Sequence, residues 1–351
     1  MDNRPVRESS EEGLTISTGP TVRDLGEFAL IEQINAGRDQ GPAVVLGPGD
    51  DAAVLTAARG RYVVSTDMLI EDRHFRLDWS GPGDIGRKAI AQNAADIYAM
   101  GAEPAGYVVG LGLPDRTPVD FVTELADGFW AEAARSGGSV AGGDIVRSPQ
   151  LVISVTAFGD PLGERPVTRS GARPGGTVAV AGQPGWSAAG YAMLSGAHPV
   201  GAGPSAEASA AAVAAHRAPR PRYDLVREAM AGDCVPDALT DISDGLLADL
   251  GHLAEASGVA IDLRYAALRD PALDRCAARL EVDARQWILT GGEDHVFAGV
   301  WPAGATPPPG WTPIGSIGAG QGVTIDGAGF PGPQGWEAFS GTDSAKPHHS
   351  R

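Results

Sequence analysis

Apolar residues recur along this chain with the spacing of helices and strands, between two polar ends. Apolar residues three or four positions apart share one face of an α-helix, which predicts helices at residues 28–34, 85–99, 118–135 and 246–253. Continuous apolar runs predict strands at residues 44–46, 61–67, 151–159, 177–182 and 287–300, the last broken by a glycine pair. Because residues 1–22 and 341–351 lack such a period, we predict that both ends are disordered.

The chain of 351 residues is long enough for two domains, and its pattern changes near residue 160. We therefore predict an amino-terminal domain over residues 23–160 and a carboxy-terminal domain over residues 161–340. An alanine-rich segment at residues 201–215 is compatible with a surface helix or with a mobile insertion.

Charge and composition exclude several classes of protein. The 44 acidic and 27 basic residues give a net charge of −17, which repels polyanions and argues against a nucleic-acid partner. No apolar run approaches the roughly 18 residues that cross a membrane, and the polar start lacks the apolar stretch of a signal peptide. Cys234 and Cys276 form neither a disulfide framework nor a zinc motif. We therefore expect a cytoplasmic protein without a membrane partner.

Lysine is rare, because only Lys88 and Lys346 occur. Lys88 lies with Gln92 and Asp96, each four residues apart, on the polar face of the helix predicted at residues 85–99. A phosphate-binding P-loop requires the pattern GxxxxGK[ST], and the nearest stretch, Gly81 to Ala89, has neither the lysine nor the hydroxyl at the required positions. The nucleophile motif GxSxG is also absent, since the residues around Ser187 read GWSAA. The sequence therefore contains neither a P-loop nor this hydrolase motif.

Aspartates stand where apolar strands end, often beside glycine or threonine. Carboxylates at strand ends and helix starts, next to glycines that permit close backbone approach, suit Mg²⁺ that also binds phosphates. Each single aspartate is equally well explained as a turn or N-cap residue. Their joint occurrence favours a metal and phosphate site that contains Asp50, Asp51, Asp67, Asp144, Asp241 and Asp244, together with Asp96, which lies on a predicted helix.

Such a site would solve an electrostatic problem if both substrates are phosphates. Two like charges about 4 Å apart repel by roughly 4 kcal/mol at an effective dielectric constant near 20, and a nucleotide that meets a phosphomonoester brings several such pairs together. Divalent cations held by carboxylates would neutralise these charges and orient the attacking oxygen, which is most of what phosphoryl transfer requires.

Nine sequence blocks occur in the order typical of one enzyme family. They are GEFALI (26–31), GPGDDAAVL (47–55), STD (65–67), HF (74–75), NAADIYAMGAEP (93–104), GGD (142–144), TRSGARPGG (168–176), DISDGLLADL (241–250) and GGED (291–294). With these blocks, residues 26–340 resemble the thiamine-monophosphate kinases, which belong to the superfamily of aminoimidazole-ribotide synthetase.

The resemblance implies a two-domain α/β (α+β) fold like that of aminoimidazole-ribotide synthetase. In this fold the amino-terminal sheet forms a barrel with the sheet of a second copy, so a homodimer is expected, and the carboxy-terminal domain is also α/β. The implied activity is ATP-dependent phosphorylation of thiamine monophosphate to thiamine diphosphate. The transfer would be direct and assisted by several Mg²⁺ ions, without a phosphoenzyme.

The resemblance also assigns roles to individual residues. The implied Mg²⁺ ligands, direct or through water, are Asp51, Ser65, Thr66, Asp67, Asp96, Asp144, Asp241 and Asp244, of which Asp51, Asp96, Asp144 and Asp241 would be catalytic. The residues implied to contact ATP are Gly143, Asp144, Arg169 and Ser243. Those implied to contact thiamine monophosphate are His74, Glu293 and Trp336. Trp336 departs from the family pattern, which more often has Asp and His before the final Phe.

Simpler interpretations of three of these residues stay open. Outside the resemblance, His74 is an ordinary surface histidine, Arg169 is a basic loop residue, and Glu293 is the cap of a turn. The guanidinium fork of an arginine nevertheless matches phosphate geometry, and in a chain nearly without lysine that role falls to arginine.

A dinucleotide-binding oxidoreductase is the main alternative from another class. The motif GPGDDA at residues 47–52 follows a strand, and Asp67 lies twenty residues after its first glycine, as in a Rossmann fingerprint. However, the two aspartates of this motif would repel a pyrophosphate, and only about eight residues remain before Gly60 for a crossover helix. Metal binding explains these aspartates, whereas dinucleotide binding does not.

Other members of the superfamily, and a scaffold without activity, are further alternatives. Selenophosphate synthetase commonly carries a reactive cysteine or selenocysteine near its start, whereas the first cysteine of this chain is Cys234. Aminoimidazole-ribotide synthetase would share the acidic nucleotide site, and a non-catalytic metal-binding protein would retain the aspartates. Release of ADP that depends on thiamine monophosphate distinguishes the kinase from both.

Overall fold

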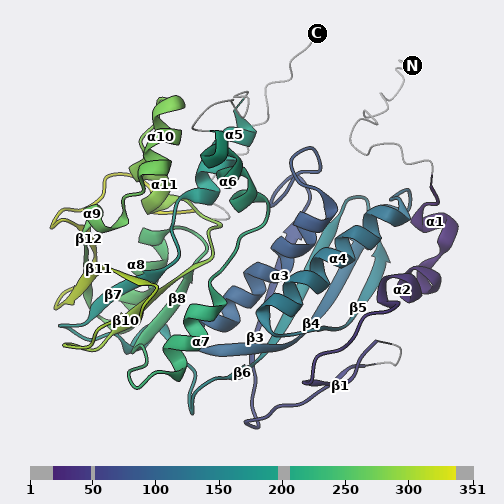
Figure 1. Cartoon of the computed structure of the whole chain (residues 1–351), viewed down its shortest axis with the longest axis horizontal. Coiled ribbons are helices and arrows are strands. Elements are labelled where there is room, and N and C mark those ends of the chain that lie inside the picture. Colours follow the sequence, from purple (N-terminus) through teal and green to yellow (C-terminus); the bar gives the residue numbers. More distant parts are fainter. Residues whose placement is uncertain (1–18, 49–51, 197–205, 337–351) are drawn as a thin grey trace, which may run out of the picture.

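The computed structural model describes residues 19–48, 52–196 and 206–336, and its strands form two larger sheets and one two-stranded sheet (Figure 1). Four strands from the first half of the chain make one large sheet, and six strands from the second half make the other. Among the described residues, none of the helices has both the length and the hydropathy needed to cross a lipid bilayer.

The described chain begins with two helices, α1 (Val22–Leu25) and α2 (Glu27–Asn35), the second of which confirms the helix predicted at residues 28–34. Residues 1–18 and 341–351 of the predicted tails lie outside the described residues. Thr21, which the sequence assigns to the tail, caps α1 and forms a β-bridge with Pro118. A short hairpin of β1 (Val44–Leu46) and β2 (Val54–Leu55) follows.

The first large sheet has the strand order β3-β6-β4-β5. Its strands are β3 (Val63–Ile70), β4 (Ala102–Leu113), β5 (Val140–Arg147) and β6 (Val152–Pro161). Strand β6 pairs antiparallel with β3 and β4, whereas β5 runs parallel to β4. Successive side chains of a strand point to opposite faces, so Ser65, Asp67 and the buried Leu69 share one face of β3, and the exposed Val64, Thr66 and Met68 share the other.

Two long helices, α3 (Pro82–Ala99) and α4 (Val119–Ser136), lie side by side over this sheet (Figure 1). The backbones of the two helices approach each other closely at two glycines. A Cβ added at Gly86 would lie 2.2 Å from the carbonyl oxygen of Leu125, and one at Gly128 would lie 2.3 Å from that of Gly83. Since real Cβ atoms do not approach backbone oxygens so closely, the helix crossing requires glycine at both positions.

The second large sheet has the strand order β12-β9-β11-β7-β10-β8. Its strands are β7 (Thr177–Ala181), β8 (Ala238–Ile242), β9 (Ala260–Leu263), β10 (Val296–Trp301), β11 (Trp311–Gly318) and β12 (Gly322–Ile325). All neighbouring pairs are antiparallel except β12 and β9. Strands β8 and β10 are buried along their whole length, which explains the apolar run of β10 and makes Thr240 and Asp241 of β8 buried polar residues.

The second half of the chain also contains a series of helices. They are the 3₁₀ turn η1 (Arg169–Gly171) and the α-helices α5 (Trp186–Ser195), α6 (Ala206–Arg217), α7 (Tyr223–Ala231), α8 (Leu246–Ser257), α9 (Tyr265–Leu268), α10 (Pro271–Arg279) and α11 (Ala284–Thr290). The predicted apolar face of α8 is confirmed, because Leu246, Leu247, Leu250 and Leu253 are all buried. The described part of the alanine-rich segment is helix α6, and residues 201–205 lie outside the described residues.

One predicted strand is wrong in its first half. Residues 284–290 form helix α11, and only residues 296–301 form a strand. Short apolar runs do not distinguish a buried helix from a buried strand. The aspartate that caps α11, Asp283, lies before the start of the predicted strand at residue 287. The glycine pair that follows does not break a strand but begins a loop between a helix and a strand.

The two halves of the chain share apolar contacts. Helix α3 packs on its own sheet and also against β8 and α7 of the second half. The ring of Tyr98 stacks on that of Tyr223 with 4.7 Å between ring centroids, and both belong to a core cluster that also contains Phe297. The division into two domains near residue 160 stays a prediction.

The close helix crossing yields a stability prediction. We expect Gly86→Ala to lower the free energy of unfolding by about 1–3 kcal/mol, because the added methyl group collides with the backbone of α4. The matched control is Gly251→Ala in α8, where an added Cβ meets nothing within 4 Å and alanine favours the helix by about 0.5–1 kcal/mol. Urea unfolding followed by circular dichroism measures both; equal stability of the Gly86 variant and the wild type would contradict the crossing.

Candidate active site

Strand β3 and helix α3 bring four polar side chains together. Ser65 and Asp67 lie on the face of β3 that α3 covers, and Asn93 and Asp96, three residues apart, lie on one face of α3. The hydroxyl of Ser65 donates to the Asp96 carboxylate at 2.6 Å. The amide N–H of Asp67 donates to the side-chain oxygen of Asn93 at 3.1 Å, so strand and helix are held in register at this point.

Asp96 is a largely buried carboxylate with other carboxylates near it. Burial and the negative charges of Asp241 and Asp67 raise its pKa to about 7, against the opposing hydrogen bond from Ser65. Asp241 belongs to the second half of the chain, so this site lies where α3 meets β8. Ionisation of Asp96 is therefore less favourable than that of a carboxyl group in water.

Asp241 lies near the end of β8 and is 3% exposed. Its carboxylate is 3.1 Å from Nδ1 of His295, which precedes β10, the antiparallel neighbour of β8. Burial acts to lower the pKa of His295, but the hydrogen bond and the negative charge of Asp241 raise it. His295 is thus the described partner that offsets part of the negative charge.

The loop after β8 is held by one carboxylate. An oxygen of the buried Asp249 accepts hydrogen bonds from the backbone N–H groups of Ser243, Asp244 and Gly245, at 3.0, 3.1 and 3.1 Å. Burial and the charge of Asp241 nevertheless raise the pKa of Asp249 to about 7. Asp244 is half-buried, and burial together with Asp241 raises its pKa as well. Asp249 therefore fixes the loop, while Asp244 adds a further acidic oxygen near Asp241.

A second loop, GGEDH at residues 291–295, lies beside the first. The N–H of Glu293 donates to the carbonyl oxygen of Ser243 at 2.7 Å, and that of His295 donates to Ile242 at 2.8 Å. Glu293 and His295 have positive φ angles of 64° and 50°, which are strained for residues other than glycine. Asp294 between them is buried and accepts from the first turn of α5, at Gly185 and Ser187.

The other residues implied to contact substrates lie around these loops. The exposed His74 accepts at Nδ1 from the N–H of Ile70 at 3.0 Å, which leaves Nε2 as its donor. In η1, Nε of Arg169 donates to the hydroxyl of Thr240, next to Asp241, at 3.3 Å. Trp336 is 70% exposed, and its backbone N–H donates to the carbonyl oxygen of Asp244 at 3.0 Å.

The structure does not bring every predicted residue into this group. The hydroxyl of Thr66 lies on the opposite face of β3 and donates to the carbonyl oxygen of Val155. Gly143 and Asp144 are exposed on the edge strand β5, where a Cβ at Gly143 would lie only 2.0 Å from the Val109 carbonyl oxygen. Asp50 and Asp51 lie outside the described residues.

The described residues offer donors for a metal ion without forming a closed cage. Within residues 19–48, 52–196 and 206–336, no three His, Cys, Asp or Glu side chains are close enough to hold a metal. The carboxylates of Asp96, Asp241 and Asp244 and the hydroxyl of Ser65 are nevertheless the hard oxygen ligands that Mg²⁺ prefers. The raised pKa of Asp96 is the observation that favours a cation here, because a nearby positive charge would relieve the repulsion.

Sequence reasoning missed several residues that organise the site. Lys88 was predicted on a polar helix face but is 2% exposed, and Asn93, His216, Asp249 and His295 were not singled out. Sequence spacing could have indicated two of them. Asn93 lies three residues before Asp96 on the same helix, and Asp249 lies four residues after the loop glycine Gly245. The roles of Lys88 and His216 depend on contacts between distant segments.

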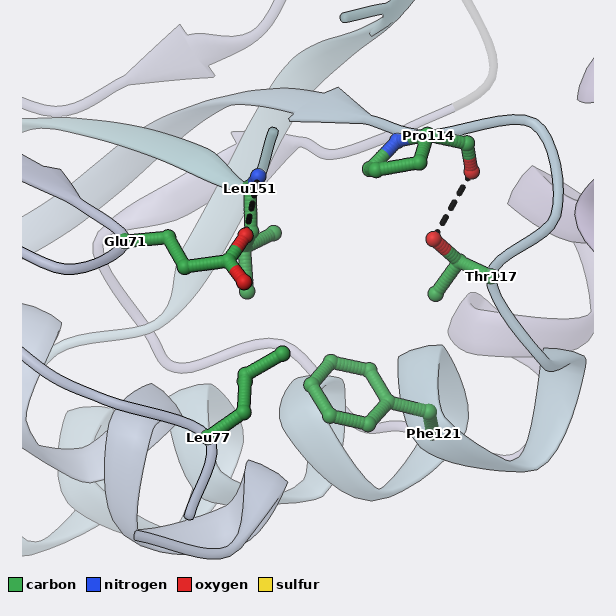
Figure 2. A pocket seen from close by; sticks show the side chains of 6 residues that line it. All are labelled: Glu71, Leu77, Pro114, Thr117, Phe121 and Leu151. Carbon is green, nitrogen blue, oxygen red and sulfur yellow. Dashed lines mark hydrogen bonds between the residues drawn. The ribbon is translucent and has the colours of Figure 1, made fainter. Parts of the chain in front are cut away.

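Figure 2 shows a small hollow elsewhere on the first half of the molecule. It is lined by Glu71, Leu77, Pro114, Thr117, Phe121 and Leu151, and a carboxylate oxygen of Glu71 accepts from the N–H of Leu151 inside it. None of the implied metal or substrate residues lines this hollow. Its lining is mostly apolar and contains no basic side chain that could bind a phosphate. The candidate site is therefore the group of Asp96, Asp241 and Asp244 with its neighbouring loops.

Comparison with known proteins identifies the family. Residues 49–160 match the family described as AIR synthase related protein, N-terminal domain. A thiamine-monophosphate kinase of Mycobacterium tuberculosis is 49% identical over 333 residues, which are 93% of this chain and 95% of that protein.

Two solved structures agree with this result. The thiamine-monophosphate kinase of Stenotrophomonas maltophilia is 34% identical, with a TM-score of 0.74 over 86% of this chain and 97% of that one. A structure described as AaThiL complexed with AMPPCP and TMP is 32% identical, with a TM-score of 0.73 over 92% of this chain and 100% of that one. By identity, coverage and fold, this chain belongs to the thiamine-monophosphate kinase family.

Proposed function

We propose that this chain transfers the γ-phosphoryl group of ATP to thiamine monophosphate, which yields thiamine diphosphate and ADP. A phosphate oxygen of thiamine monophosphate forms the new bond to the γ-phosphorus, and the bond from that phosphorus to the β–γ bridging oxygen breaks. The carrying observation is the 49% identity to a thiamine-monophosphate kinase across 93% of the chain. The meeting of Asp96 with Asp241 between the two halves supports the same activity.

The site residues have proposed roles in binding Mg²⁺. Of the implied ligands, Ser65, Asp67, Asp96, Asp241 and Asp244 lie near the junction of α3 and β8, and the proposal adds Asp51 and Asp144 from the family pattern. Thr66 is not included, because its hydroxyl lies on the opposite face of β3 and donates to Val155. When bound, Mg²⁺ supplies positive charge to the phosphates of both substrates. His295 and the hydrogen bond from Ser65 hold the two central carboxylates in place.

The two substrates have proposed positions on adjacent loops. Ser243 and Arg169, with Gly143 and Asp144, would contact ATP, and Glu293, His74 and Trp336 would contact thiamine monophosphate. The hydrogen bond from the Glu293 N–H to the Ser243 carbonyl oxygen makes the two loops direct neighbours, as transfer between two bound phosphates requires. Asp249 fixes the loop after β8, which contains Ser243, through hydrogen bonds from three backbone N–H groups.

The proposal includes a homodimer in the cytoplasm. The face of β3 that α3 does not cover exposes Val64 and Met68, at 55% and 53%, and the edge strand β5 exposes Val146 at 54%. Large apolar side chains gathered on one sheet are suited to burial against a second copy. The cytoplasm is the proposed location because the reaction consumes ATP, and because both cysteines are free thiols.

The activity is tested by coupled detection of ADP. We expect the purified chain to release ADP only when ATP, thiamine monophosphate and Mg²⁺ are all present, and chelation with EDTA to stop the release reversibly. Omission of each component in turn is the control. Quenching of NADH fluorescence without metal would favour the dinucleotide-binding alternative, and ADP release without thiamine monophosphate would contradict the proposed acceptor.

The central carboxylate is tested by Asp96→Asn. We expect turnover to fall at least about a hundredfold, because the amide cannot supply the negative charge to the proposed cation site. Since burial and neighbouring charges raise the pKa of Asp96, its ionised form destabilises the fold, so the variant should unfold at no lower temperature than wild type. The control is the exposed Asp127→Asn, and a fully active Asp96 variant would refute the role.

The dimer is tested by Met68→Asp. We expect analytical ultracentrifugation to show a dimer for the wild type and a monomer for the variant, because a carboxylate on this apolar face opposes burial. The matched control is Val282→Asp, which places the same charge on an exposed valine of the second half, at 46% exposure. A wild-type chain that sediments as a monomer would rule out the proposed assembly.

A further inference from the structure

Lys88 is an unusual lysine, because it lies in the middle of α3 and is only 2% exposed. Its ammonium group donates to the carbonyl oxygens of His74 and His216, at 3.0 and 3.4 Å, and to the Glu293 carboxylate at 3.0 Å. These contacts use all three donors of the ammonium group. A buried lysine with every donor satisfied is costly to assemble, and it is retained where its charge has a partner.

The partners of Lys88 come from three separate segments. His74 lies in the connection between β3 and α3, His216 lies in the last turn of α6, and Glu293 lies in the GGEDH loop. Two of these residues, His74 and Glu293, are those proposed to contact thiamine monophosphate. One ammonium group therefore links the substrate-contacting residues of both halves of the chain.

Charge identifies Lys88 as the main partner of Glu293. His216 also lies near the carboxylate, with 3.5 Å between its Nδ1 and Glu293, but burial and the charge of Lys88 lower its pKa to about 4. His216 is therefore neutral near pH 7, where its Nδ1 also pairs with the hydroxyl of Ser187 at 3.1 Å. Burial acts to raise the pKa of Glu293, whereas Lys88 lowers it, and the outcome is a lowered pKa.

The backbone of Glu293 is also in a strained conformation. Glu293 has a φ of 64°, a conformation that residues other than glycine adopt at a cost. The backbone N–H of Glu293 donates to the carbonyl oxygen of Ser243, and its carboxylate accepts from Lys88. Both the backbone and the side chain of this residue are therefore fixed.

We propose that Lys88 is a positioning residue for thiamine monophosphate, which holds the carboxylate of Glu293 and the backbone of His74 in the arrangement that binds this substrate. The inference rests on the proposed function, because it takes thiamine monophosphate as the ligand beside Glu293. It assigns no contact between Lys88 and the substrate.

A merely structural link between the two halves is the competing explanation, and the chain contains a matched example. Arg227 of α7 donates from Nε to Glu103 at 2.6 Å and from Nη2 to the carbonyl oxygen of Ser136 at 2.9 Å. Like Lys88, it joins the halves through one carboxylate and backbone oxygen. Unlike Lys88, it touches no residue of the candidate site.

The experiment compares Lys88→Met with Arg227→Met in the full chain with Mg²⁺ present. Titration calorimetry measures the Kd of thiamine monophosphate and of ATP separately, and thermal unfolding measures stability. We expect Lys88→Met to weaken thiamine monophosphate binding at least about tenfold while the Kd of ATP changes less than twofold. Arg227→Met should lower stability without changing either Kd. Equal effects of both variants on the two Kd values would overturn the proposal.

Two further variants keep the test decisive if Lys88→Met folds poorly. Glu293→Gln leaves Lys88 in place, and we expect it to weaken thiamine monophosphate binding at least about tenfold as well. Lys88→Arg retains the charge and should recover part of the affinity. If Glu293→Gln binds thiamine monophosphate as wild type does, the proposal is overturned.

The double variant Lys88→Met with Glu293→Gln should bind thiamine monophosphate no more weakly than the weaker single variant, because both changes remove one interaction. Additive losses would contradict the proposed route through Glu293. Wild-type binding of thiamine monophosphate without ADP release would refute the proposed kinase activity and leave the positioning role intact. A wild-type chain that does not bind thiamine monophosphate overturns both.

Discussion

The repulsion between buried carboxylates is the constraint on which the rest of the site depends. Asp96 comes from a helix of the first half and Asp241 from an edge strand of the second, so packing the two halves brings like charges together. The fold accepts this cost through Ser65 and His295, which each satisfy one carboxylate. An arrangement that is unfavourable alone and favourable with a cation is typical of a binding site rather than of a structural core.

Around this centre, loops are fixed by buried charged groups rather than by regular structure. Asp249 holds the loop after β8, Asp294 holds the start of α5, and Lys88 holds the GGEDH loop. Asp249 binds the residues directly before its own helix, whereas Asp294 and Lys88 bind groups from distant segments. The strained backbone conformations of Glu293 and His295 are therefore held by contacts with neighbouring segments.

The sequence predicted the periodic parts of this molecule well. The apolar face of α8 and the strand at residues 177–181 followed directly from spacing. Asp67 and Asp241 were singled out from their positions at strand ends, and Asp96 from its place on a helix. The run at residues 287–300 was misassigned because its helix is short and buried. Lys88 was predicted on a polar helix face, and helical spacing does not reveal that α6 and the GGEDH loop cover this face. Thr66 was grouped with Ser65 and Asp67, although alternation along β3 sends its side chain the other way.

The stacked rings of Tyr98 and Tyr223 come from the two halves of the chain and belong to one core cluster. Each half thus buries apolar side chains of the other. A fragment ending at Pro161 would leave the Tyr98 ring exposed to water. Separation of the halves would expose this aromatic surface at the same moment as it parted Asp96 from Asp241. Packing between the two halves therefore maintains the aromatic contact and the proximity of these two carboxylates together.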